Sequence, residues 1–219
     1  MLKQYTAKFL RTLDPADLQP ALKALLDGVD PLDGNFNEMS LKAFLMGLLH
    51  PHRSEVDVIN EPRLKDGSRR ADLLLTHRDG RQVLIECKTL MPHQLSLPGF
   101  KDTRTTHFWS INDKEGVHKV LCGMARSDLL QVPLAAKIAG STSIVDDVFT
   151  GARVQLESFG PLFNDDQTRD RAVRRLPKLQ QPKLLVVSTV WNTHLAVEEV
   201  PFPVKSTTRK TGRKKTVTA

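Results

Sequence analysis

Residues 69–89 read RRADLLLTHRDGRQVLIECKT and predict two β-strands joined by a tight turn. The first apolar run covers residues 71–77, and the second run, residues 82–89, alternates between apolar and polar side chains. Between them stands Asp79-Gly80, a pair that favours a two-residue hairpin turn because glycine adopts positive φ without strain. The stretch therefore predicts an antiparallel hairpin.

Alternation along the second strand sorts its side chains onto two faces. The apolar residues at the odd positions 83–87 point to one face, and Leu84, Glu86 and Lys88 point to the other. Folding at the turn brings Asp72, near the start of the first strand, beside the end of the second strand. Two carboxylates and one ammonium group are therefore expected to converge at the open end of the hairpin.

These side chains suit a metal-assisted hydrolysis. Two carboxylates, from Asp72 and Glu86, can hold Mg²⁺, which prefers oxygen ligands and keeps several waters. The backbone carbonyl of Cys87 is a third candidate ligand. Bound Mg²⁺ lowers the pKa of a water and stabilises charge on a phosphate, and Lys88 would orient or deprotonate that water. The alternative interpretation is a half-exposed hairpin that carries a cross-strand ion pair.

The same residues resemble the motif of the PD-(D/E)XK nuclease superfamily, an Asp at the start of one strand and Asp/Glu-x-Lys on the next. Asp72 and Glu86-Cys87-Lys88 match it, with Ala71 where the motif has Pro. The resemblance implies an α/β fold with a restriction-endonuclease-like αβββαβ core, in which helices flank a mixed central sheet. It also implies a Mg²⁺-dependent phosphodiesterase, with Mn²⁺ as a substitute, that hydrolyses DNA or, less often, RNA.

Hydrophobic periodicity predicts the elements around the hairpin. Residues 39–50 and 144–159 read as amphipathic helices, residues 55–61 and 183–191 as strands, and residues 196–204 as an edge strand. A helix over 117–138, broken near Pro133, and a charged helix over 165–176 are also expected. Helix, three strands, helix and strand is the order that the resemblance implies.

The chain divides into three parts on this interpretation. Residues 1–34 form an N-terminal helical extension, with helices over 3–13 and 16–26. Residues 35–204 form the nuclease-like domain, with an insertion at about 90–117. Residues 205–219 form a basic tail that we expect to be disordered, because it is rich in charge and poor in apolar side chains.

Two further site residues come from the resemblance. The helix before the sheet often contributes an acid in this superfamily, and Glu38 matches it, either through water or as part of a second metal site; a first-turn Glu favoured by the helix dipole is the alternative. Residues 155–159, QLESF, resemble the Gln-containing motif of the RecB-like and lambda-exonuclease-like branch, with Phe159 where that motif has Tyr. The resemblance implies that Gln155 positions nucleic acid or the site; an exposed Gln on the surface of a helix is the alternative.

Basic and aromatic side chains outside the hairpin are candidates for nucleic-acid contact. They are Lys101, Arg104 and Trp109 in the 90–117 insertion, and Lys210, Arg213 and Lys214 in the tail. An insertion whose aromatic side chains pack into the core is the alternative for the first group. The net charge of +7 favours a polyanionic partner, although the excess lies mainly in the tail.

Composition sets the remaining expectations. The 219 residues include two cysteines and no apolar run of membrane-spanning length, so we expect a cytoplasmic protein without membrane attachment. A second hypothesis is a catalytically inactive or partner-dependent nucleic-acid-binding subunit of a recombination, defence or mobile-element complex. Assembly as a homo-oligomer or within a larger nucleoprotein complex stays open.

Overall fold

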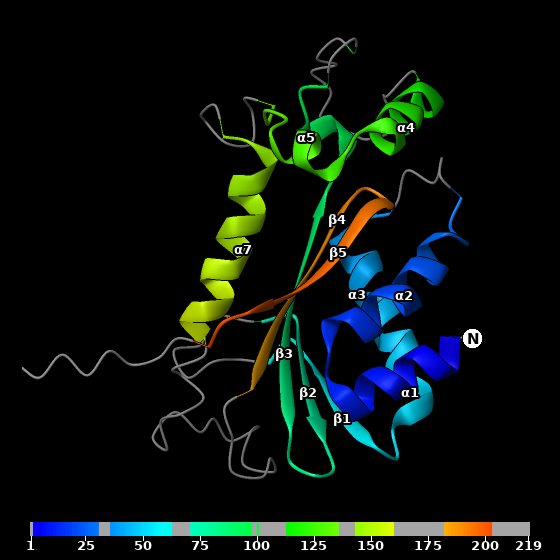
Figure 1. The fold of residues 1–219 in the computed structure, drawn as a ribbon, viewed down its shortest axis with the longest axis vertical. Helices are drawn as coiled ribbons and strands as arrows, with labels where there is room; N and C mark the ends of the chain where they lie inside the picture. The colour runs from blue at the N-terminus through cyan, green and yellow to red at the C-terminus, as the bar shows by residue number, and fades with distance from the viewer. Residues whose placement is uncertain are drawn as a thin grey trace, which may run out of the picture.

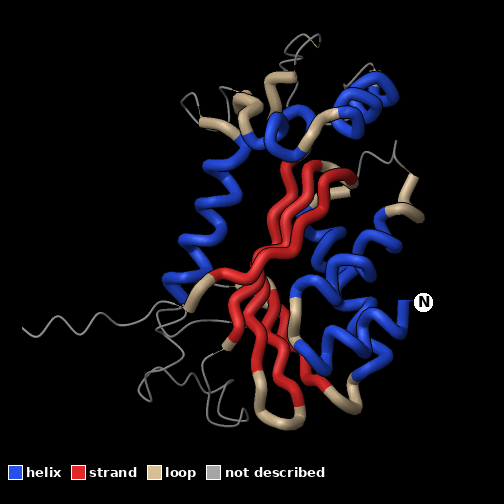
Figure 2. Tube along the Cα trace, in the orientation of Figure 1, coloured by secondary structure: helices blue, strands red, loops and turns tan. Residues whose placement is uncertain are grey.

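A computed structural model of the chain describes residues 2–30, 36–62, 71–97, 100, 113–135, 143–159 and 182–202. Within these residues five strands form one sheet in the order β1-β2-β3-β4-β5. Helices pack on both faces of the sheet (Figures 1 and 2). The expected α/β class with a mixed sheet flanked by helices is confirmed.

The sheet is antiparallel except at its centre. Its strands are β1 (Val56–Asn60), β2 (Leu73–His77), β3 (Gln82–Leu90), β4 (Lys183–Val190) and β5 (Thr193–Val200). Strands β1, β2 and β3 pair antiparallel in chain order, β3 pairs parallel with β4, and β4 pairs antiparallel with β5. The parallel pair requires a crossover connection between β3 and β4, and that connection contains the helices α4, α5 and α7.

Two groups of helices cover the sheet. The N-terminal group is α1 (Leu2–Thr12), α2 (Pro15–Leu26) and α3 (Glu38–Leu49), and the crossover group is α4 (Lys114–Gly123), α5 (Arg126–Leu130) and α7 (Val145–Phe159). Figure 1 shows α1–α3 on one face and α7 on the other. Helix α2 contacts β5, α3 contacts β3, and α7 contacts β3 and β4, so both layers share one sheet.

Burial follows the alternation expected for β3. Val83, Ile85 and Cys87 lie in the core formed with α1–α3, whereas Leu84 lies in the smaller core formed with α7, beside Leu156. All four side chains are almost fully buried. A strand that is buried on both faces suits a central position in the sheet, and it places residue 86 on the α7 face.

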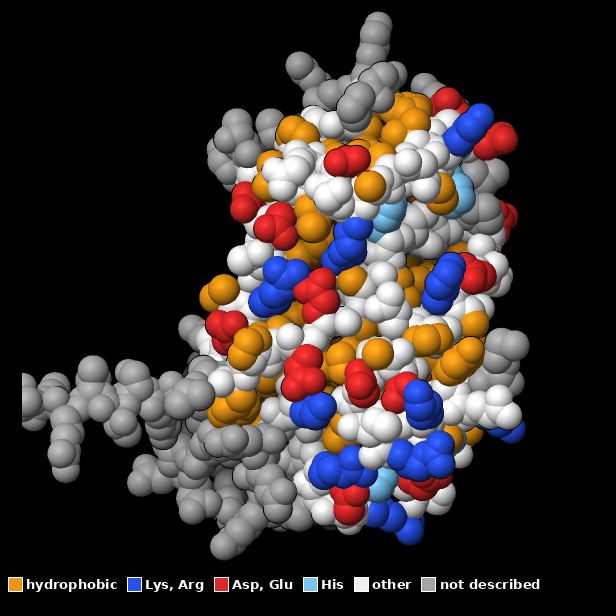
Figure 3. All heavy atoms as spheres, in the orientation of Figure 1, with side chains coloured by type: hydrophobic (Ala, Val, Ile, Leu, Met, Phe, Trp, Pro, Cys, Tyr) orange, Lys and Arg blue, Asp and Glu red, His pale blue; other side chains and the backbone are white. Residues whose placement is uncertain are grey.

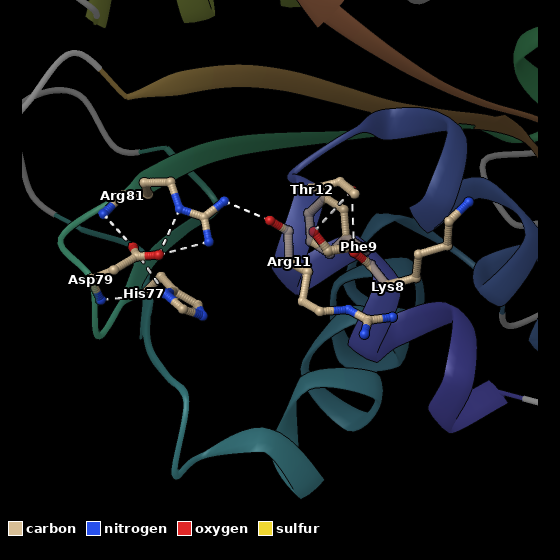
Figure 4. A network of polar contacts seen from close by, with 7 residues as sticks. All are labelled: Lys8, Phe9, Arg11, Thr12, His77, Asp79 and Arg81. Carbon is tan, nitrogen blue, oxygen red and sulfur yellow. Dashed lines mark hydrogen bonds and ion pairs between the residues drawn. The ribbon is translucent and has the colours of Figure 1, made fainter.

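The β2–β3 turn is fixed to the N-terminal helices. The strands pair up to His77 and Arg81, so the turn is a three-residue loop over residues 78–80 and not the two-residue turn expected from Asp79-Gly80. Gly80 has φ 89°, the left-handed conformation that a three-residue hairpin loop needs at its last residue. The Arg81 guanidinium donates to Asp79 Oδ2 at 2.8 Å and to the carbonyl oxygen of Arg11 in α1 at 2.7 Å (Figure 4). The hydrogen bonds from Arg81 also hold the pKa of Asp79 well below its usual range. The closed end of the hairpin is therefore held against α1.

Capping sets the start of α3 and with it the place of Glu38. The Asn37 side chain accepts from the Ser40 N–H at 3.1 Å, and the Ser40 hydroxyl accepts from the Asn37 N–H at 3.3 Å. This reciprocal pair is a capping box, which satisfies two of the N–H groups that a helix leaves open at its start. Glu38 is consequently the first residue of α3.

The helix expected over residues 117–138 is wrong in its extent. Helix α4 ends at Gly123, because Met124 and Ala125 adopt extended backbone, and α5 covers only Arg126–Leu130. Beyond α5, Pro133 pairs with Ile144 and Leu134 with Leu95 through isolated β-bridges. The helix expected over residues 165–176 lies outside the described residues, as does the tail from residue 205.

The expectation for the last strand is also corrected. Strand β5 begins at Thr193, three residues earlier than expected, and ends at Val200. The chain turns at once after β4, with Trp191 and His194 in left-handed conformations. In the described part of the chain, no helix has the length and apolar character needed to cross a membrane.

Two glycine substitutions test the hairpin geometry. Gly80→Ala should lower the free energy of unfolding by about 1 kcal/mol, because alanine is strained at the positive φ of this turn. Gly47→Ala should instead raise the free energy of unfolding by about 0.5–1 kcal/mol, because Gly47 is an exposed helical residue of α3 with open space at its Cβ position. Urea denaturation of both variants measures the two changes in the free energy of unfolding. Changes of the same sign would contradict the left-handed conformation of Gly80 in the turn.

Candidate metal and catalytic site

Asp72 and Glu86 meet at the point where β2 begins. The register places Leu73 opposite Ile85, so the residue before β2 lies next to Glu86. Asp72 Oδ2 accepts a hydrogen bond of 2.7 Å from the backbone N–H of Cys87. Because Asp72 precedes β2, its carboxylate can accept the hydrogen bond from β3 that a backbone carbonyl oxygen would accept farther along the strand pair. The structure thus brings together the two carboxylates that the sequence singles out.

Glu86 is buried with half of its carboxylate unpaired. Its side chain comes from the central strand, and the residue is only 6% exposed. Glu86 Oε1 accepts from the Gln155 amide of α7 at 2.8 Å, whereas Oε2 has no hydrogen-bond partner among the described residues. A buried ionised oxygen without a partner is costly, so this position favours either a proton or a cation.

Electrostatics point to the same conclusion. Burial, followed by the negative charges of Asp72 and Glu38, raises the pKa of Glu86 to about 8, against the opposing effects of Lys88 and of the Asp72 backbone N–H. Burial also raises the pKa of Asp72, although the Cys87 N–H that it accepts works in the other direction. Two carboxylates that disfavour each other's charge form a site that gains stability when a cation binds.

Lys88 and Glu38 flank this pair. The Lys88 ammonium lies 3.2 Å from Glu38 Oε2, and both side chains are partly exposed, at 36% and 42%. Glu38 therefore reaches the site from the first turn of α3, as expected, and pairs there with Lys88. The Lys88 ammonium keeps solvent access, which suits a group that handles water or phosphate.

Lys42 of α3 is the site residue that the sequence analysis missed. Its ammonium lies 2.9 Å from Glu61 Oε1 and 3.7 Å from Asp72 Oδ1. Burial lowers its pKa, but the contacts with Glu61 and Asp72 outweigh that effect and the pKa is raised. Lys42 stands four residues after Glu38, on the same face of one helix, and that spacing is the signal that could have found it.

The oxygen atoms at this site fit a hard divalent cation. The Cys87 N–H points toward Asp72, and the N–H and C=O of one residue in an extended strand point to the same side. The Cys87 carbonyl therefore points to the side of β3 that β2 leaves open before its first residue, where Asp72 also lies. Carboxylate and carbonyl oxygens are the ligands that Mg²⁺ takes, and the unpaired Glu86 Oε2 is the atom that such an ion would satisfy.

The protein supplies few ligands to this position. Over the described ranges, no group of three His, Cys, Asp or Glu side chains lies close enough together to hold a metal ion. Mg²⁺ is commonly bound by one or two carboxylates while it keeps several waters, so a two-carboxylate site is within its ordinary range.

The other predicted site residues divide into two groups. Gln155 contacts Glu86, so the structure places it beside the carboxylate pair. The six basic and aromatic candidates lie outside the described residues: Lys101, Arg104, Trp109, Lys210, Arg213 and Lys214.

Replacing the buried carboxylate should stabilise the metal-free protein. With a pKa near 4.5 unfolded and about 8 folded, Glu86 holds an extra proton in the folded state between these values. Stability therefore falls as the pH rises from about 4.5 to about 8. Glu86→Gln removes this loss and should raise the free energy of unfolding by roughly 2–4 kcal/mol near pH 8.

Thermal melts in EDTA at pH 5 and pH 8.5 measure this difference. The gain from Glu86→Gln should be small at pH 5 and larger at pH 8.5. Glu115→Gln, a change at an exposed acid of α4, serves as the matched control and should shift neither melt. A gain from Glu86→Gln that does not depend on pH would contradict the buried-carboxylate account.

Comparison with known proteins identified no related protein. No family model matches the chain. Neither the curated proteins nor the solved structures contain a match. The geometry of the site itself is therefore what bears on function.

Proposed function

We propose that this protein is a divalent-metal-dependent nuclease that hydrolyses phosphodiester bonds, most readily in DNA. One observation carries the proposal. The partly buried carboxylate of Asp72 lies beside the buried carboxylate of Glu86, which has an unpaired oxygen, and Lys88 projects from the same face of β3 as Glu86. Buried carboxylate oxygens in structural ion pairs are usually hydrogen-bonded, so the unpaired oxygen of Glu86 favours a ligand at this position.

The arrangement of elements supports the proposal. Helix α3, strands β1 to β3, helix α7 and strand β4 follow one another, and β4 lies parallel beside β3. This order, with α4 and α5 added between β3 and α7, is compatible with the αβββαβ core that the resemblance to PD-(D/E)XK nucleases implies. In the motif, the Asp stands at the start of the second strand and Glu-x-Lys on the third; here Asp72 directly precedes β2, and Glu86 and Lys88 lie in β3.

Each side chain has a role in the proposed reaction. Asp72, Glu86 and the Cys87 carbonyl would hold Mg²⁺, which when bound supplies Lewis acidity at the phosphate and a more acidic water. Gln155 fixes one oxygen of Glu86 and so orients the other. Lys88 would orient the attacking water and offset charge that develops on the phosphate, and its contact with Glu38 holds the ammonium in place.

The net charge of +7 favours a polyanionic substrate, and the resemblance implies DNA more often than RNA. On the face seen in Figure 3, basic and acidic side chains are interspersed, and the described residues there form no continuous basic surface. Arg126 and Arg153, for example, both contact Glu198. Phosphate contacts would come from the site itself and from the basic side chains that the sequence singles out in residues 101–112 and in the tail.

Metal-dependent cutting that requires Lys88 is the test of this proposal. Purified protein incubated with linear, supercoiled, single-stranded and branched DNA should cut at least one of them with Mg²⁺ and none with EDTA. Lys88→Ala should lower the cleavage rate by about a hundredfold or more, as loss of a positioned acid–base group does. Lys119→Ala removes an exposed lysine of α4 and should cut like the parent protein.

Other outcomes point elsewhere. Cutting by Lys88→Ala at the parental rate would contradict the assignment of the site. Binding of every DNA without cutting, with or without metal, would favour the partner-dependent subunit. An RNA arm of the same panel decides between the two nucleic acids as substrate.

A further inference from the structure

Lys42 bridges two carboxylates on neighbouring strands. Glu61 follows β1 and Asp72 precedes β2, and the Glu61 N–H donates to the Asp72 carbonyl oxygen at 2.8 Å. The Lys42 ammonium, from α3, lies within ion-pair distance of both side chains. Its side chain is only 13% exposed, so this position is part of the interior of the site.

A bridging position of this kind is where a second metal ion would bind. Two-metal phosphodiesterases share a carboxylate between ions about 3.5–4 Å apart, and the second ion needs at least one further acid. Asp72 is the carboxylate available for sharing, and Glu61 and Glu38 are the further acids nearby. Lys42 already contacts Glu61, and Lys88 already contacts Glu38.

The charges of the described site residues balance for a single divalent ion. The acids are Glu38, Glu61, Asp72 and Glu86, and the bases are Lys42 and Lys88. When all of them are ionised, two negative charges remain, which is the charge that one Mg²⁺ neutralises. A second divalent ion would leave the site with excess positive charge beside an ammonium group that is largely shielded from water.

We propose that Lys42 takes the place of a second metal ion, so that the site binds one divalent cation per chain. The inference rests on the metal site of the proposed function and deepens it. Lys42 acts as a positioning residue: it neutralises Glu61, holds the Asp72 oxygen that Cys87 does not contact, and leaves Glu86 and Asp72 to a single ion. Glu38 then forms an ion pair with Lys88 and does not complete a second metal site.

Counting bound Mn²⁺ tests this directly. Titration of the full chain with Mn²⁺, followed by the electron paramagnetic resonance signal of the free ion, should give one bound ion per chain. Lys42→Met keeps an unbranched side chain that is one heavy atom shorter and removes its charge, and this variant should bind a second, weaker Mn²⁺. Lys42→Arg keeps the charge and should bind one.

A double variant identifies where the additional ion binds. Lys42→Met combined with Glu61→Gln removes the acid that would hold the second ion, and should return the count to one. Circular dichroism and thermal melts establish that each variant is folded, so that a low count is not caused by unfolding. This readout does not depend on DNA cutting.

The outcomes separate the two proposals. One ion bound by both the parent and Lys42→Met would overturn the role of Lys42 while leaving the Asp72–Glu86 site in place. Two ions bound by the parent would overturn the one-ion inference. No ion bound by the folded parent would overturn the metal site and this inference together. One ion bound without cutting of any substrate would contradict only the nuclease.

Discussion

The hydrogen bond from the Cys87 backbone to the Asp72 carboxylate is the contact on which the site depends. At the start of β2, the Asp72 side chain accepts the hydrogen bond from the Cys87 N–H in place of a backbone carbonyl oxygen. As a result an acid that would otherwise reach solvent lies against the buried Glu86. The pKa values of both carboxyl groups are then raised, and a cation that binds between them stabilises the folded protein.

The surrounding elements hold this contact in place from several sides. Arg81 ties the closed end of the hairpin to α1, which fixes the direction in which β2 and β3 run. The capping box at Asn37 sets the start of α3, so that Glu38 and Lys42 point at the open end of the hairpin. Helix α7 covers the other side and contributes Gln155. Crowding like charges in this way lowers stability, a cost that functional sites commonly carry.

Much of this arrangement is readable from local sequence. Alternation along residues 82–89 places Glu86 and Lys88 on one face, and the Asp79-Gly80 turn brings Asp72 beside them. Asn37 before an apolar period predicts the start of α3. Lys42 and the partner of Gln155 could not be predicted, because each contact depends on how a helix packs across the sheet. The break after Gly123 was missed because residues 117–130 keep a helical apolar pattern through Met124 and Ala125.

Anomalous diffraction from crystals soaked in Mn²⁺ tests the central claim most directly, since it locates the ion without reference to activity. The account predicts one anomalous peak per chain, within bonding distance of Asp72, Glu86 and the Cys87 carbonyl oxygen. Crystals of Glu86→Gln grown and soaked in the same way should lose it. A parent crystal with an empty site at saturating Mn²⁺, or with its peak remote from Asp72 and Glu86, would contradict the account.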